Sequence, residues 1–139
     1  MPTEKSAGVI VFHRGHDLKY LLLHYEAGHW EFPRGNIEAR ETAQEAAQRE
    51  LAEETGIRRM TPVPGFEEKV NWFYMRDSQR IFKEATFFLA ETAQQQVKIS
   101  REHIGYAWLS YGNAMKKLTF KNAQSVLEKA HQRLLGIHA

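Results

Sequence analysis

Residues 35–57 read GNIEARETAQEAAQRELAEETGI, and this stretch decides how the rest of the chain is interpreted. Thr42 and Glu45 have the spacing of a capping box, in which two side chains satisfy the free backbone amides at the start of a helix. Gly56 follows the last periodic residue, where glycine readily takes the left-handed conformation that ends a helix. The stretch therefore predicts a glycine loop followed by a helix over Ala43–Thr55.

Three carboxylates lie one turn apart on this predicted helix. Glu50, Glu53 and Glu54 stand at positions i, i+3 and i+4, which share one helical face. Like charges at this spacing repel, so the arrangement costs stability unless a cation joins them. A solvated acidic face is the alternative interpretation of such a string taken alone. The chain has no cysteine, so oxygen or imidazole would hold a metal, and Mg²⁺ or Mn²⁺ is favoured.

The other helix positions fit a charged face above a narrow apolar stripe. Arg49 precedes the carboxylates and can hold Glu41 or Glu45 through a bidentate contact. Alanines in the stripe allow close approach to a sheet, and its members are Ala43, Ala46, Ala47 and Leu51.

Composition bounds the class of protein. The chain has 139 residues, 42% hydrophobic and 26% charged, which predicts one globular domain over residues 1–139. The absence of cysteine excludes disulfides, and a reducing cytoplasm fits. The net charge of +2 is too small to imply nucleic acid by itself. The apolar run over residues 7–12 is too short for a signal peptide core or a membrane span, so we expect no membrane.

Outside the central stretch, runs of β-branched and aromatic residues predict strands at residues 7–13, 19–25, 60–70, 72–75, 81–91 and 106–109, with a short extended segment at 30–33. The first two are expected to form a hairpin, and residues 77–79 a turn. A C-terminal helix is expected, with Thr119 as its cap and Val126, Leu127, Ala130 and Leu134 on one face. The sum predicts an α+β fold, a mixed β-sheet between α-helices in αβα layers.

Residues 35–57 resemble the Nudix box. That pattern is Gly, five residues, Glu, seven residues, Arg-Glu, an aliphatic residue, any residue, Glu-Glu, any residue, Gly and an aliphatic residue, and every fixed position matches. The resemblance implies the Nudix fold, with the box forming a loop, a helix and a loop. It also implies an enzyme that hydrolyses a nucleoside diphosphate linked to another moiety.

Roles for individual residues follow from the same resemblance. Arg49 and Glu41 would form an orienting pair. The general base varies across the family, so Glu50, Glu54 or a carboxylate outside the box stay open. The metal ligands that the resemblance implies are the Gly35 carbonyl, Glu50, Glu53 and Glu54.

Across nearly its full length the chain also resembles the asymmetrical diadenosine tetraphosphate hydrolases of animal and archaeal type. That family usually has Pro-Lys-Gly-His before the box, whereas this chain has Pro33-Arg34-Gly35-Asn36. Arg34 keeps the positive charge but presents a planar fork, and Asn36 lacks a titratable ring. Both are placed among the substrate-binding residues, where they would alter phosphate binding or substrate choice.

The resemblance supplies further candidates outside the box. Trp72 and Phe120 match aromatic positions and are expected to stack on a purine, which contributes roughly 1–3 kcal/mol per base. Tyr74 shares strand parity with Trp72, so both would face the substrate. The alternative for these aromatics is a place in the core. The remaining candidates are Lys83 for polyphosphate, Glu102 as a late metal ligand, and His103 as an orienter or phosphate contact. His24 and His29 are assigned no role.

Three functions stay open. The first is Mg²⁺-dependent hydrolysis of a dinucleoside polyphosphate, in particular asymmetrical cleavage of diadenosine tetraphosphate to ATP and AMP by a monomer. The second is a different Nudix activity, on RNA 5′ ends or on damaged nucleoside triphosphates; a basic groove would favour RNA, and the small net charge argues against it. The third is a non-catalytic nucleotide-binding module, against which the complete set of box carboxylates argues.

Overall fold

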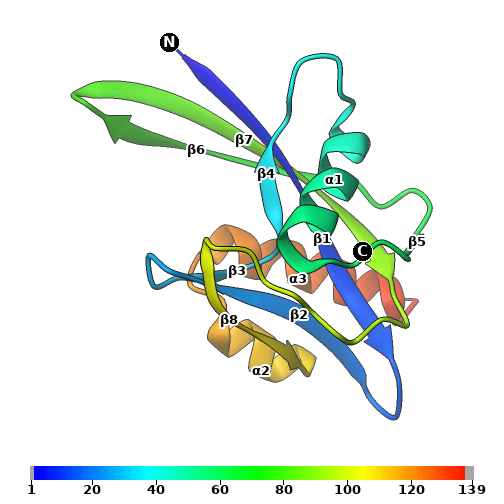
Figure 1. The fold of residues 1–139 in the computed structure, drawn as a ribbon. Helices are drawn as coiled ribbons and strands as arrows, with labels where there is room; N and C mark the ends of the chain where they lie inside the picture. Colours follow the sequence, from blue (N-terminus) through cyan, green and yellow to red (C-terminus); the bar gives the residue numbers. More distant parts are fainter. Residues whose placement is uncertain (1, 137–139) are drawn as a thin grey trace.

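The computed structural model describes residues 2–136. In that part of the chain the strands and helices come in the order shown in Figure 1. The strands are β1 (Thr3–Arg14), β2 (Leu18–Tyr25), β3 (Trp30–Glu31), β4 (Arg34–Asn36), β5 (Thr61–Pro62), β6 (Glu68–Arg76), β7 (Gln79–Glu91) and β8 (His103–Leu109). The helices are α1 (Ala43–Thr55), α2 (Tyr111–Lys117) and α3 (Lys121–Leu134).

Strand β1 lies at the centre of one mixed sheet. It runs parallel to β7 from the pair Thr3 and Phe82 to the pair Phe12 and Glu91, and antiparallel to β2 and β4. Outward from these, β6 pairs with β7, while β3 and β8 pair with β2, all antiparallel. The predicted hairpin of the first two strands is confirmed, and so is the mixed sheet.

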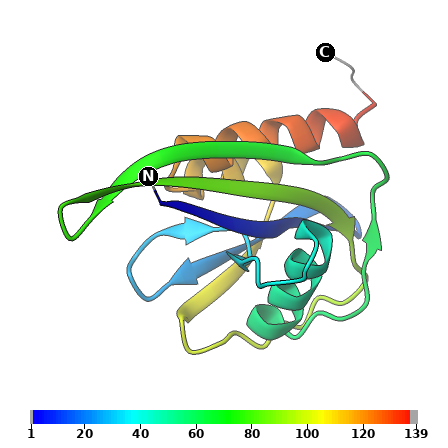
Figure 2. The ribbon, with the colours of Figure 1, turned by 90° about the horizontal axis from the view of Figure 1, so that it is seen from above.

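Two cores lie on opposite faces of β1, because successive side chains of a strand point to opposite faces. Ala7, Val9 and Val11 pack with α1, whereas Ile10 and Phe12 belong to the core under α2 and α3. Figure 2 shows α3 on one side of the long strands and α1 on the other. The αβα layering is therefore confirmed. Within residues 2–136, no helix has both the length and the apolar content to cross a membrane.

Helix α1 has the predicted bounds and caps. The Thr42 hydroxyl accepts a hydrogen bond from the Glu45 amide at 3.1 Å, and the Glu45 carboxylate accepts one from the Thr42 amide at 2.9 Å. Gly56 ends the helix with φ 74°. Ala46, Ala47 and Leu51 are buried against the sheet. Local backbone chemistry thus sets the two ends of the helix, and the apolar stripe fixes it on the sheet.

The predicted bounds of two strands are wrong, and the sequence gives no signal for one helix. Residues 60–70 are not one strand, because Pro62 and Pro64 lack amide hydrogens and Gly65 turns the chain with φ 80°. The following strand instead starts at Glu68 and includes the separate segment predicted at 72–75. Helix α2 was not expected, since it is short and contains Gly112 and Asn113.

Thr119 does not cap the C-terminal helix. The N-cap of α3 is Phe120, which makes no side-chain cap hydrogen bond. The Thr119 hydroxyl accepts instead from the backbone amide of Trp30 at 2.9 Å. This contact ties the connection between α2 and α3 to β3, so a tertiary partner takes the hydroxyl that the sequence assigned to a local cap.

Replacing Thr42 with alanine removes one half of the capping box. We expect the free energy of unfolding to fall by about 1 kcal/mol, the usual cost of losing such a cap. The measurement is urea denaturation followed by circular dichroism. Gln44→Ala, in the same turn and exposed, is the control and should change stability by less than about 0.5 kcal/mol. Equal stability of the two variants would contradict the role of the cap.

Candidate active site

Gly35 lies against the first carboxylate of the cluster. It sits in β4, paired with Ala7 of β1, and the Glu50 carboxylate of α1 lies beside its α-carbon. A β-carbon added at Gly35 would be 2.1 Å from Cδ of Glu50. Only glycine therefore lets the β4 backbone and this carboxylate occupy their places, which is the physical reason for glycine at the start of the pattern.

Arg49 gathers the carboxylates around its guanidinium. It holds Glu41 through two bonds, from Nε at 2.6 Å and from Nη2 at 2.9 Å. Its Nη1 reaches Glu50 at 2.8 Å and Glu53 at 3.3 Å, while Nη2 also donates to the Asn36 carbonyl at 3.0 Å. The fork thus joins the loop after β4 to the helix. Of the two partners that the sequence allowed, Arg49 holds Glu41, and Glu45 serves the helix cap.

The carboxylates around Arg49 differ in proton affinity. The Arg49 fork, with the backbone amide of Glu38, lowers the pKa of Glu41 to about 2. Burial raises the pKa of Glu50 above its usual range, although Arg49 opposes that effect. Glu41 is therefore a fixed anion, whereas Glu50 takes up a proton more readily, as a base facing a reaction requires.

Glu54 points into the protein, away from the exposed Glu53. Its Oε1 accepts from the Tyr25 hydroxyl at 3.4 Å and lies 3.3 Å from Nε2 of His103. Its Oε2 is buried and has no hydrogen-bond partner. Burial raises the pKa of Glu54 to about 6; His103 opposes the shift, and the charges of Glu50 and Glu102 add to it. A cation bound beside this buried carboxylate would stabilise its ionised form.

The segment before β8 brings two more donors to Glu54. One ligand atom from each of Glu54, Glu102 and His103 lies within 4.8 Å of the others. Glu102 is exposed, and its carbonyl accepts from the Glu26 amide at 2.8 Å, which fixes the segment to the end of β2. The oxygen-rich donors and the unpartnered Glu54 oxygen together fit a divalent metal ion.

A cavity of about 470 Å³ opens beside the carboxylates. Gly35, Glu50 and Glu102 line it on one side, and Arg34 and Lys83 bring positive charge. Burial, and then Arg34, lowers the pKa of Lys83. Asn36 is exposed at the rim, and neither Glu53 nor Glu54 lines the cavity. Carboxylates next to fixed cations are the arrangement that a polyphosphate and its metal ions need.

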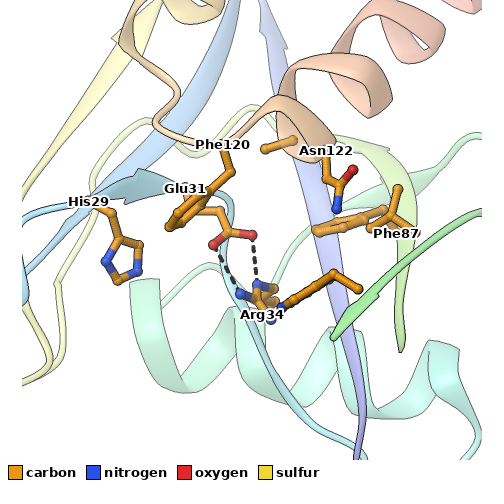
Figure 3. A pocket seen from close by; sticks show the side chains of 9 residues that line it. His29, Glu31, Arg34, Phe87, Phe120 and Asn122 are labelled. Carbon is orange, nitrogen blue, oxygen red and sulfur yellow. Dashed lines mark hydrogen bonds and ion pairs between the residues drawn. The ribbon is translucent and has the colours of Figure 1, made fainter. Parts of the chain in front are cut away.

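A second cavity, of about 320 Å³, adjoins the first and is largely aromatic and apolar (Figure 3). His29, Glu31 and Arg34 line both cavities. The side chains that line only the second are Val70, Trp72, Phe87, Phe120, Asn122 and Ala123. Trp72 and Phe120, separate in sequence, therefore meet around one space.

Arg34 stands between the two cavities. It donates to Glu31 through Nε at 2.7 Å and Nη2 at 3.1 Å (Figure 3). It also donates to the Ser6 hydroxyl at 3.3 Å. Its guanidinium carbon lies 5.4 Å from the centre of the Trp72 ring. Glu31, only 4% exposed, fixes the orientation of the guanidinium. The planar fork thus holds both oxygens of one carboxylate while it lies over an aromatic ring, and a lysine has no fork for this bidentate contact.

Two of the predicted substrate-binding residues, Tyr74 and His103, line neither cavity. Tyr74 shares a face of β6 with Trp72, but its hydroxyl donates to Glu4 and accepts from Arg76, and it lines neither cavity. The β6–β7 hairpin, to which Tyr74 belongs, projects beyond the helices (Figure 2). His103 is buried behind Glu54, which argues against the predicted phosphate contact.

Sequence reasoning missed Glu31 and His29. Glu31 is a lone acid in the apolar segment Trp30-Glu31-Phe32-Pro33, a signal that it has a buried partner. His29 lines both cavities and stacks on Tyr25 with ring centres 4.5 Å apart, but no local pattern distinguishes it from the other histidines. Only the fold places His29 in the wall of the two cavities.

The chain belongs to the Nudix family: the family model for the NUDIX domain matches residues 2–130. Over 97% of its length it is 30% identical to the asymmetrical bis(5′-nucleosyl)-tetraphosphatase of Sus scrofa and 31% identical to that of Mus musculus, covering 98% of each. A crystal structure of a C. elegans Ap4A hydrolase binary complex superposes with a TM-score of 0.84 at 26% identity, covering 96% of this chain and 99% of that one. The predictions of a Nudix hydrolase and of the Nudix fold are confirmed.

The buried charge of Glu54 predicts a stability gain on its removal. Folding raises the pKa of Glu54 from 4.5 to about 6. The contribution of the neutral carboxyl to stability is therefore fully present below pH about 4.5, and it is lost as the pH rises through about 6. In metal-free protein at pH 7.5, Glu54→Gln should therefore raise the free energy of unfolding by about 1–2 kcal/mol, since one pKa unit corresponds to about 1.4 kcal/mol. The measurement is urea denaturation.

The gain should shrink toward pH 4.5, where Glu54 itself is neutral. Glu53→Gln, whose side chain is 57% exposed, is the matched control and should leave stability nearly unchanged at both pH values. A Glu54→Gln variant that is less stable than the unmodified protein at pH 7.5 would show that the carboxylate is well compensated.

Proposed function

We propose that this protein is a metal-dependent hydrolase of dinucleoside polyphosphates, which cleaves diadenosine tetraphosphate asymmetrically to ATP and AMP. The observation that carries the proposal is the pair of adjoining cavities, one charged and one aromatic, with Arg34 between them. A dinucleoside polyphosphate offers the same pair of features, a purine and a long phosphate chain. The names of the full-length relatives support this choice.

The proposed metal ligands are the Gly35 carbonyl and the carboxylates of Glu50, Glu53, Glu54 and Glu102. Mg²⁺ or Mn²⁺ suits this oxygen-rich set. When bound, such an ion polarises a phosphoryl oxygen and neutralises the charge that develops on it. The unpartnered Oε2 of Glu54 is the observation that supports the fit.

The protein's own groups prepare the attack of water. Burial raises the pKa of both Glu50 and Glu54, but Glu50 lines the cavity and Glu54 does not, so Glu50 is better placed to accept the proton of the attacking water. Arg49, held in turn by Glu41, fixes the Glu50 carboxylate through its bond at 2.8 Å. Glu54 then contributes from behind as a ligand rather than as the base.

The substrate would occupy both cavities, one on each side of Arg34. We expect Trp72 and Phe120 to stack on one adenine, with Asn122 available to its edge. Arg34, Lys83 and Asn36 would contact the phosphates. Tyr74 is left out because it lines neither cavity. The enzyme is expected to act as a monomer in the cytoplasm.

The direct test incubates the protein with diadenosine tetraphosphate and Mg²⁺ and separates the nucleotides. Equal amounts of ATP and AMP are expected. A symmetrical yield of ADP, or no turnover while triphosphorylated RNA or a damaged nucleoside triphosphate is cleaved well, would refute the proposal.

A matched pair of aromatic variants tests the base site. Trp72→Ala should raise KM for diadenosine tetraphosphate by roughly 10-fold or more, since stacking contributes roughly 1–3 kcal/mol per base. Phe73→Ala is the control, because Phe73 follows Trp72 in β6, points to the opposite face of the strand and lines neither cavity. Steady-state kinetics decide, and the same KM for both variants would remove Trp72 from the base site.

A further inference from the structure

The imidazole of His103 presents an unpartnered nitrogen to the buried carboxylate of Glu54. The His103 side chain is fully buried, and its Nε2 lies 3.3 Å from Oε1 of Glu54. That approach does not have hydrogen-bond geometry, so Nε2 and Oε2 of Glu54 are the two buried side-chain atoms in residues 2–136 that lack a partner. Buried polar atoms without partners are costly, and here two of them belong to neighbouring residues.

The other ring nitrogen of His103 is already engaged. Nδ1 lies 2.9 Å from the Ser100 hydroxyl, and the Tyr25 ring packs edge-on against the imidazole with centres 4.4 Å apart. When Nδ1 donates to Ser100, Nε2 carries a lone pair and no proton, 3.3 Å from Oε1 of Glu54. A hydrogen bond on the distal nitrogen that fixes ring orientation is the usual support of a metal-binding histidine.

We infer that Nε2 of His103 is a metal ligand, which together with Glu54 and Glu102 forms a mixed nitrogen and oxygen site for a transition-metal cation such as Mn²⁺. The three ligand atoms lie within 4.8 Å of one another, a distance that one ion can span. The inference rests on the proposed function only in placing a metal beside Glu54. It adds a ligand outside the Nudix box and a preference among ions.

The preference follows from the donor chemistry. Mg²⁺ requires near-ideal octahedral oxygen ligands and keeps several waters, whereas imidazole nitrogen suits first-row transition metals. A site with one nitrogen should therefore select Mn²⁺ over Mg²⁺ more strongly than carboxylates alone would. The alternative is that Nε2 carries the proton and only positions Glu54, in which case His103 would support both ions equally.

The experiment measures metal binding without nucleotide or turnover. Pulsed electron paramagnetic resonance of the Mn²⁺-loaded protein should show coupling to an imidazole nitrogen. The coupling should persist in His29→Gln, at the nearby cavity wall, and in His16→Gln, on the exposed turn after β1. It should vanish in His103→Gln. Absence of the coupling from the unmodified protein, or its loss in His29→Gln instead, would overturn the inference.

Affinities provide the second measurement. His103→Gln should weaken Mn²⁺ binding by about 10-fold or more and Mg²⁺ binding by less than about 3-fold. Glu102→Gln, whose exposed side chain leaves folding unaffected, should weaken Mn²⁺ binding but keep the nitrogen coupling. Equal losses for both ions in His103→Gln would assign His103 to positioning and contradict ligation.

These results are independent of the substrate. If the nitrogen coupling is present but diadenosine tetraphosphate is not cleaved, the proposed function fails and the His103 site stands. If ATP and AMP are released by a protein without the coupling, the reverse holds.

Discussion

The fork of Arg49 is the interaction on which the site depends. Three carboxylates from one loop and one helix would repel one another, and a single planar guanidinium contacts all of them, Glu41, Glu50 and Glu53, at 3.3 Å or less. Its remaining donor holds the Asn36 carbonyl, so the loop cannot move independently of α1. Arginine suits this task because its donors have fixed directions and its charge does not titrate. The glycine at position 35 is the steric counterpart, since it leaves room for Glu50.

The arrangement trades stability for reactivity. Glu54 is buried with an unpartnered oxygen, and its raised pKa records the cost of keeping it ionised near neutral pH. This cost is offset by the caps of α1, by the packing of its alanines against β1 and by the two cores. Strain of this kind is concentrated where a protein performs its function, and the same carboxylate is the one that a cation would satisfy.

The elements set by local chemistry could be predicted from the sequence. Helix α1 and its ends follow from Thr42, Glu45 and Gly56, and the carboxylate pattern identified the family. Features that depend on distant contacts could not be predicted. The Thr119 hydroxyl accepts a hydrogen bond from the Trp30 amide and does not cap α3. Tyr74, on the β6–β7 hairpin, donates to Glu4 and lines neither cavity. The pairing of Arg34 with Glu31 and the burial of His103 behind Glu54 likewise needed the fold.

The central claim, that Arg49 holds the carboxylates in a metal-binding arrangement, is tested most directly by the Mn²⁺ dissociation constant of Arg49→Lys. Lysine keeps the positive charge but cannot reach Glu41, Glu50 and the Asn36 carbonyl at once. We expect Arg49→Lys to bind Mn²⁺ more weakly by about 10-fold or more, as is usual when a group that orients metal ligands is lost. A variant that folds normally and binds Mn²⁺ as tightly as the unmodified protein would contradict it.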